Sequence, residues 1–305
     1  MRAKILYLGL LLLGFVSYSQ QDSQYTQYMY NTIEVNPAYA GSRGVLSMFG
    51  LYRTQWVGLD GAPKTANVSV NTPIANSNLG LGVSVVNDVI GPTTENTISL
   101  DVSYSIPTSE TYKLSFGVKG TANLFSIEKE KLKVQTANDP VYLALQDKNF
   151  FSPNVGAGVY FHSSKTYFGL SVPNVLETKR LTTDQTTFYK ERMNAYFIAG
   201  HVFEISDNIK FKPALMSKLV QGAPLQVDVS GNFMFYEKLV LGLAWRWDAA
   251  VSAMAGFQVN KGLYIGYGYD KETTKLANYN SGSHEIFLRY ELFKKPERIV
   301  SPRFF

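Results

Sequence analysis

Apolar and polar residues alternate at every second position, and this feature most constrains how the chain can fold. The stretch 225–236 reads LQVDVSGNFMFY. In an extended backbone its Leu, Val, Gly and Phe residues point to one side, and its Gln, Asp, Ser and Asn residues point to the other. Such alternation is typical of a strand with one face buried in apolar surroundings. The apolar face could meet a protein core or lipid.

The same period of two recurs along nearly the whole chain. It predicts about fourteen strands, at 45–53, 65–72, 79–87, 96–106, 111–126, 153–162, 166–172, 193–204, 209–219, 225–236, 238–247, 250–259, 262–270 and 284–293. Most of them approach the ~9–11 residues that a tilted strand needs to cross a bilayer. Strands of soluble proteins have only about five or six residues.

The expected connections alternate in length. The connections after even-numbered strands are short, at 73–78, 107–110, 163–165, 205–208, 237 and 260–261; several after odd-numbered strands are long, at 54–64, 127–152, 173–192 and 271–283. Outer-membrane barrels alternate in this way, with turns in the periplasm and loops outside. We therefore predict an all-β fold, a transmembrane antiparallel β-barrel of about 14 strands over residues 45–293. An even number of strands predicts that both termini are periplasmic.

A soluble β-sandwich also has alternating strands, but its polar face would meet water. Here that face is rich in Gly, Ser, Ala and Asn, and it carries scattered opposite charges, namely Asp101, Lys119, Asp228, Arg246, Glu285 and Arg289. This pattern favours a crowded lumen. The glycine-containing stretches 79–82 and 266–268 lie inside alternating strands, where we expect close packing or barrel curvature. The apolar side of 225–235 is then expected to face lipid.

The first residues have the composition of an export signal. Arg2 and Lys4 precede an apolar run over 5–16, and the small residues Ser17 and Ser19 follow it. This order predicts a signal peptide over residues 1–19, with cleavage after Ser19. No later stretch has the roughly 18 apolar residues of a membrane helix. The mature chain is therefore expected to be either soluble or a barrel.

The sequence offers no chemistry of the usual catalytic kinds. It has no Cys, and its three His residues, His162, His201 and His284, fall on different expected strands without ligand spacing. The net charge of +5 is dispersed, with no basic block of the kind that binds nucleic acid. We expect no enzyme activity, cofactor, metal or nucleic-acid binding.

Residues 20–44 form a lead-in segment before the first strand. Tyr25, Tyr28, Met29 and Ile33 have the spacing of one face of a short helix, and Asn36-Pro37 would end it. We expect this segment to pack on or into the periplasmic mouth of the barrel. Tyr25, Tyr28 and Met29 are then candidate partner-binding residues. An ordered lead-in without a binding role is the alternative.

Residues 294–305 form a tail after the last strand. The tail reads KKPERIVSPRFF, and its candidate partner-binding residues are Lys294, Lys295, Arg298, Arg303, Phe304 and Phe305. A basic periplasmic tail that ends in two aromatic residues could be a docking peptide. The alternative is a disordered tail, although aromatic residues are uncommon in disorder.

Several blocks of the sequence carry a family resemblance. They read SQYTQYMYNTIEVNPAYAGSRG, RTQWVGLDGAPKT, LGLGVSVVNDVIGPT, GLSVPNVLE, FKPALMSKLVQGAPLQVDVSGNFMFYEKLVLG, SHEIFLRYELF and SPRFF. Together they resemble the PorP/SprF family of Bacteroidota over residues 21–305. The resemblance implies an outer-membrane component of the type IX secretion system. It also implies a role in export or surface attachment of proteins with a C-terminal sorting domain, in some members a gliding adhesin.

The resemblance implies two kinds of partner besides outer-membrane lipid. These are periplasmic or peptidoglycan-linked secretion subunits and an exported client. Because fourteen strands enclose modest space, we favour an adaptor over a conduit. In that interpretation the loops 127–152 and 173–192 meet a client outside. The alternatives are a plugged transporter of fatty-acid type for small or hydrophobic solutes and a surface adhesin barrel.

Overall fold

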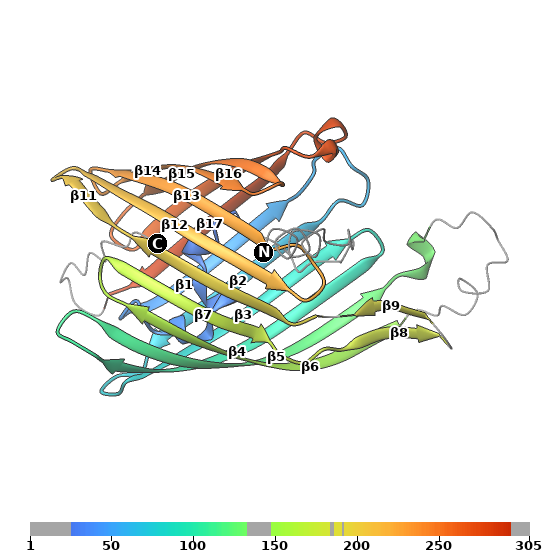
Figure 1. The fold of residues 1–305 in the computed structure, drawn as a ribbon, viewed down its shortest axis with the longest axis horizontal. Helices are drawn as coiled ribbons and strands as arrows, with labels where there is room; N and C mark the ends of the chain where they lie inside the picture. The colour runs from blue at the N-terminus through green and yellow to red at the C-terminus, as the bar shows by residue number, and fades with distance from the viewer. Residues whose placement is uncertain (1–25, 133–147, 184–185, 191, 294–305) are drawn as a thin grey trace, which may run out of the picture.

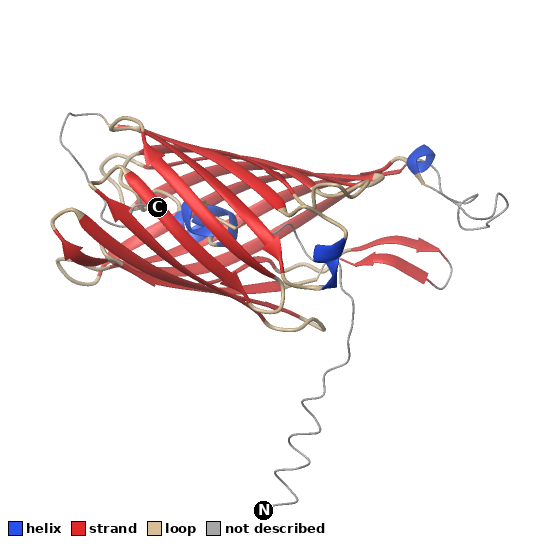
Figure 2. Ribbon diagram, turned by 90° about the horizontal axis from the view of Figure 1, so that it is seen from above, coloured by secondary structure: helices blue, strands red, loops and turns tan. Residues whose placement is uncertain are grey.

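The computed structural model describes residues 26–132, 148–183, 186–190 and 192–293. The expected signal peptide and the tail 294–305 lie outside the described residues. The described chain forms an elongated β-barrel, seen from the side in Figure 1 and from above in Figure 2.

The barrel wall is one antiparallel sheet in which strands that follow one another in the chain lie side by side. Its strands are β1 Leu46–Thr54, β2 Lys64–Pro73, β3 Leu79–Ile90, β4 Thr93–Pro107, β5 Lys113–Ile127, β6 Lys148–His162, β7 Thr166–Asn174, β10 Asn194–His201, β11 Phe203–Ser206, β12 Ile209–Val220, β13 Gln226–Phe235, β14 Leu239–Arg246, β15 Ala250–Gln258, β16 Leu263–Glu272 and β17 Ser283–Leu292. The first and last strands pair, and so do β10 and β12, so the sheet closes on itself. Closure leaves no free edge in the wall, as lipid requires.

Strands β10 and β11 occupy a single position in the wall. Both pair with β12, and the register is the same on either side of the break, from Gly200 opposite Ala214 to Phe203 opposite Phe211. Pro213 lies opposite the break and has no N–H to donate. The described residues therefore form the predicted barrel of fourteen strand positions.

The predicted strand boundaries differ from the observed ones by a few residues. The clearest differences lie in two long connections. Strand β6 begins at Lys148, inside the predicted loop 127–152, and a separate hairpin of β8 Lys179–Thr183 and β9 Thr186–Lys190 lies inside 173–192. The hairpin sequence is rich in Thr, a good strand former that a test for apolar alternation does not register.

The two ends of the barrel differ, as the alternation of connections predicts. The loop end carries the connections 55–63, 91–92, 128–147, 175–193, 221–225, 247–249 and 273–282, and the turn end carries 74–78, 108–112, 163–165, 207–208, 236–238 and 259–262. The β8–β9 hairpin extends from the loop end, at the right of Figure 1. The last described strand, β17, finishes at the turn end.

Apolar side chains cover the outside of the wall. On β13, Val229 and Phe233 are 44% and 42% exposed, whereas Asp228 and Asn232 on the opposite face are 5% and 0% exposed. The predicted outward direction of the apolar face is therefore confirmed. Among the described residues, the helices are all too short or too polar to cross a bilayer.

The buried core of the protein lies inside the barrel. It joins inward side chains of the wall to three short helical turns that precede β1: η1 Tyr28–Tyr30, α2 Thr32–Val35 and η2 Pro37–Tyr39. The blue ribbon in Figure 1 follows this part of the chain into the barrel, and Figure 2 shows helical turns within the ring of strands. The lumen is thus filled by the chain's own N-terminal residues.

Two ion pairs on the inner wall join neighbouring strands. Asp101 faces Lys119 in register, with 3.3 Å between Oδ1 and Nζ, and Asp228 faces Arg246, with 2.6 Å between Oδ1 and Nε. All six charges that the sequence assigns to the lumen are buried. Pairing keeps the desolvation penalty of these groups tolerable.

The pair of Asp101 and Lys119 provides a stability test. Replacing Lys119 by Met would leave the Asp101 carboxylate buried without its cation, which costs about 3–5 kcal/mol. We expect the K119M barrel to unfold at lower urea concentration than the unmodified barrel, as measured by tryptophan fluorescence in lipid vesicles.

Two comparisons make this test specific. The double variant D101N/K119M should recover part of the loss, because no lone charge is left in the lumen. Val118→Met, on the outward and exposed face of the same strand, should leave the unfolding curve nearly unchanged. Equal stability of K119M and the unmodified protein would contradict the pairing.

Candidate functional site in the barrel lumen

Residues Thr26–Gly41, called here the lumen segment, run through the barrel from the loop end towards the turn end. Thr26 contacts Arg53, one residue before the loop end of β1. At the other end of the segment, the N–H of Gly41 donates to Oδ1 of Asn71, near the turn end of β2. Every residue from Thr26 to Ala40 is buried except Glu34, which is half-buried.

The lumen segment is not the single amphipathic helix that the sequence suggests. The wall surrounds the segment, so residues on all its sides are buried, and the helix is broken into three short turns. The expected stop at Asn36-Pro37 is confirmed, because α2 ends at Val35. Asn36 Oδ1 accepts from the N–H of Ala38 at 3.0 Å, and Asn36 Nδ2 donates to the Val159 carbonyl at 3.0 Å.

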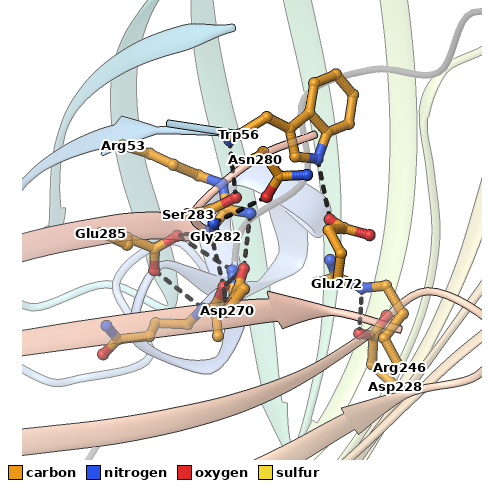
Figure 3. Close-up of polar contacts among 12 residues, drawn as sticks. Arg53, Trp56, Asp228, Arg246, Asp270, Glu272, Asn280, Gly282, Ser283 and Glu285 are labelled. Carbon is orange, nitrogen blue, oxygen red and sulfur yellow. Dashed lines mark hydrogen bonds and ion pairs between the residues drawn. The ribbon is translucent and has the colours of Figure 1, made fainter. Parts of the chain in front are cut away.

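A buried ionic cluster holds the start of the lumen segment. The two carboxylate oxygens of Glu285 accept the N–H groups of Thr26 and Gln27, both at 3.1 Å. Arg53 joins Glu285 at 3.2 Å and Asp270 at 2.7 Å, and the Thr26 hydroxyl lies 2.7 Å from Asp270 Oδ1. Figure 3 shows Arg53, Asp270 and Glu285 converging. Hydrogen bonds to charged groups are stronger than neutral ones, so this cluster fixes the backbone firmly.

Two long loops join next to this cluster at the loop end. The Trp56 N–H donates to the Ser283 hydroxyl at 3.2 Å, and its indole Nε1 donates to Glu272 at 2.9 Å (Figure 3). The backbone N–H of Val57 donates to the Gly282 carbonyl at 2.9 Å. The loops 55–63 and 273–282 are therefore tied to each other and to the strand ends.

Aromatic packing holds the middle of the lumen segment. The Tyr30 ring stacks on Tyr264 with centroids 5.4 Å apart, and their hydroxyls are 3.1 Å apart. Phe287 lies 4.7 Å from the Tyr30 ring. Lys212 Nζ lies 5.3 Å from the same ring and the Arg289 guanidinium 5.9 Å, within the range of cation–π attraction.

Side chains of the wall also satisfy the polar groups of the segment. Asn31 donates to Asn67 at 3.0 Å and accepts from Ser69 at 2.8 Å, while Asn67 donates to Glu34 at 2.9 Å. Three backbone carbonyls of the segment accept from wall side chains: Ile33 from Lys119, Val35 from Ser171 and Ala40 from Ser103. These short turns lack a full helical ladder, so the wall supplies their partners.

Six inward glycines form a glycine seat for the lumen segment: Gly80, Gly82, Gly117, Gly158, Gly169 and Gly268. A Cβ atom at any of them would come closer than 3.0 Å to an atom of the segment. At Gly80 and Gly117 the obstructing atoms are backbone atoms of Ala40 and Ala38. The close packing expected for 79–82 is confirmed, and its partner is the chain's own N-terminal segment.

A second ionic cluster lies at the turn end, where the lumen segment leads into β1. Arg43 forms an ion pair with Glu291, and Arg289 lies 3.8 Å from the same carboxylate. All three side chains are nearly buried. Charged groups therefore hold the chain near both mouths. At the loop end, Glu285 and Asp270 accept hydrogen bonds from the lumen segment, and at the turn end Arg43, just after the segment, pairs with Glu291.

The predicted partner-binding residues fall into two groups. Tyr28 and Met29 lie inside the lumen, 4% and 1% exposed. Tyr25 and the tail residues, listed above within 294–305, lie outside the described residues. A partner could reach Tyr28 and Met29 only if the lumen segment left its place, so partner binding by them stays a prediction.

Sequence reasoning missed Arg53, Asp270 and Arg43 as members of the two anchors. Arg53 and Asp270 lie at inward positions of their strands, so the period of two could have placed them with Glu285. The sequence gives no sign that Glu285 accepts hydrogen bonds from the backbone of Thr26 and Gln27.

The family model described as "Type IX secretion system membrane protein PorP/SprF" matches residues 17–290. The chain belongs to the PorP/SprF family. No curated protein matches the chain.

Solved structures show the fold. The Pseudomonas putida toluene transporter TodX has a TM-score of 0.51 at 8% identity, covering 90% of this chain and 94% of that chain. A Pseudomonas aeruginosa FadL homologue has a TM-score of 0.44 at 12% identity, covering 87% and 94%. The KdgM porin has a TM-score of 0.38 at 8% identity, covering 81% and 99%. At these identities the likeness concerns the fold alone.

Family membership and the barrel fold together indicate the general function. The protein is a membrane component of the type IX secretion system, a β-barrel that works with other components of that system. The family points to a non-enzymatic role. Within the part of the chain that the structure describes, no group of three His, Cys, Asp or Glu residues could hold a metal ion.

The glycine seat gives a prediction with an internal control on β5. Gly117→Ala places a Cβ against the Ala38 backbone, whereas a Cβ at Gly120 meets nothing within 4 Å. We expect G117A to lose about 1–3 kcal/mol of unfolding free energy through overpacking. It should also expose the lumen segment to protease. G120A should match the unmodified protein in both assays, and equal behaviour of the two variants would refute the seat.

Proposed function

We propose that this barrel is a non-enzymatic adaptor of the type IX secretion system that supports export or surface attachment of sorting-domain proteins. The observation that carries the proposal is the filled lumen. A component whose interior is occupied by its own chain can act through its two ends and its outer wall. The exported protein would then cross the membrane elsewhere.

The contacts of the lumen segment argue for a permanent filling. The segment is anchored by Glu285 and Asp270 near one mouth and by Asn71 and Ser103 near the other. Each hydrogen bond to a charged group is worth about 1.5–3 kcal/mol. Pulling the segment out would also remove the two backbone hydrogen bonds of Glu285 and empty the glycine seat. An open conduit would have to lose all these contacts at once.

The two ends suit different partners. We place the loop end outside the cell, where the loops 128–147 and 175–193 would meet an exported client, a gliding adhesin being one candidate. The turn end would face periplasmic or peptidoglycan-linked subunits. Because Tyr28 and Met29 are buried, the tail 294–305 is the stronger candidate for docking to those subunits.

The alternative is a plugged transporter of fatty-acid type for small or hydrophobic solutes. A filled lumen is compatible with it if the segment can be displaced. Ion conductance separates the two functions, because an adaptor has no reason to open.

Conductance is expected to depend on the lumen segment. The purified, unmodified protein should be closed in a planar lipid bilayer, since the segment fills the lumen. Deleting residues 22–41 should give steady single-channel currents, because the polar inner wall then borders water. Frequent opening of the unmodified protein to the conductance of the deletion would favour the transporter.

The docking role of the tail can be tested in native outer membranes. Tagged protein with and without residues 294–305 is crosslinked and purified, and secretion of sorting-domain proteins is measured in the same cells. We expect the deletion to lose secretion subunits and to reduce secretion while the barrel is still assembled. Unchanged recovery and secretion would defeat the docking proposal.

A charge variant refines this experiment. Lys294, Lys295, Arg298 and Arg303 are replaced together by Glu, which keeps Phe304 and Phe305. If docking is electrostatic, this variant should behave like the deletion; if the two aromatic residues dominate, it should resemble the unmodified protein.

A further inference from the structure

The direction of the lumen segment determines which face of the barrel its first residues approach. From Thr26 to Gly41 the chain descends from the loop end to the turn end, and then it reverses into β1. Thr26 lies against Arg53, Asp270 and Glu285, all within two residues of the loop-end limits of their strands. The segment therefore has its N-terminal end next to the long loops.

We propose that the mature amino terminus emerges at the loop end, on the same side of the membrane as the long loops and opposite the turns. This differs from the placement of both termini at the turn end that an even strand count predicts. An even number of strands means that β1 begins at the end of the barrel where β17 finishes. It does not determine where the residues before β1 emerge, because those residues have crossed the lumen.

Chain length supports this placement. If the signal peptide ends at Ser19, residues 20–25 remain before Thr26, and they span at most about 20 Å when fully extended. The apolar band of an outer-membrane barrel is about 25 Å tall. These residues are too short to return from the ionic cluster to the turn end. They would also have to pass through a lumen that the segment already fills.

The surroundings of Thr26 support the same placement. Loops 55–63 and 273–282 are joined directly beside the ionic cluster, through Val57 with Gly282 and Trp56 with Ser283. Thr26, the first described residue of the segment, therefore lies next to these two loops. The placement depends on the path of the segment and on cleavage after Ser19, and it holds whatever the function.

Because the chain has no native cysteine, single-cysteine labelling can test the proposal. Ser23→Cys reports on the amino terminus, Asp60→Cys on the exposed loop 55–63, and Glu110→Cys on the exposed turn 108–112. Intact cells that express each full-length variant are treated with a membrane-impermeant maleimide polymer, and the gel shift is read before and after the outer membrane is permeabilised.

The proposal predicts that Ser23→Cys shifts under the same condition as Asp60→Cys and under the opposite condition from Glu110→Cys. Labelling of Ser23→Cys together with Glu110→Cys would overturn it. The comparison is internal, so it holds even if the loop end faces the periplasm. In that event Asp60→Cys labels only after permeabilisation, which contradicts the orientation under the proposed function and leaves this inference intact.

A second variant is needed in case the barrel shields the thiol of Ser23→Cys from the polymer. A short Gly-Ser linker with one cysteine, inserted between Gln21 and Asp22, moves the thiol away from the mouth. We expect it to label together with Asp60→Cys. Labelling together with Glu110→Cys, or no labelling before denaturation, would show that the terminus does not emerge at the loop end.

Discussion

The carboxylate of Glu285, which binds the N–H groups of Thr26 and Gln27, is the interaction on which the rest of the lumen depends. A carboxylate buried this deeply is costly unless it is paired and hydrogen-bonded. Arg53 supplies the pairing and also holds Asp270, and the segment supplies the hydrogen bonds. The wall therefore needs the segment as much as the segment needs the wall, which makes the filling part of the fold.

The same reciprocity extends along the lumen. A fourteen-strand wall with polar inward faces would hold water if it were empty, and its ion pairs would be better solvated. The glycine seat instead removes side chains where the backbone of Ala38 and Ala40 comes closest, and Ser103 satisfies a segment carbonyl. The glycines leave space for the backbone of the segment, and the polar side chains form hydrogen bonds with it. The inner wall is therefore complementary to this one peptide. The result suits a component that acts through its surfaces.

The sequence predicts the barrel well because a period of two determines both the strand and the face that it turns to lipid. It predicts the inward position of Asp101 and Lys119 for the same reason, and it predicts the stop at Asn36-Pro37 from proline geometry. It does not predict the path of the segment. The ligand of Glu285 is backbone, which every residue has, so no residue type marks the site. The β8–β9 hairpin was not predicted because its threonines give strand propensity without apolar alternation.

The filled lumen requires that Thr26–Gly41 stays inside the assembled barrel. Hydrogen–deuterium exchange of the protein in lipid nanodiscs tests it most directly, because amides bonded inside the barrel exchange only when the structure opens. The account predicts that peptides covering 26–41 are protected as strongly as those from β1 and β17, and far more than those from loop 55–63. If amides of the segment exchange as fast as those of loop 55–63, the segment is not held inside the barrel and the lumen is open.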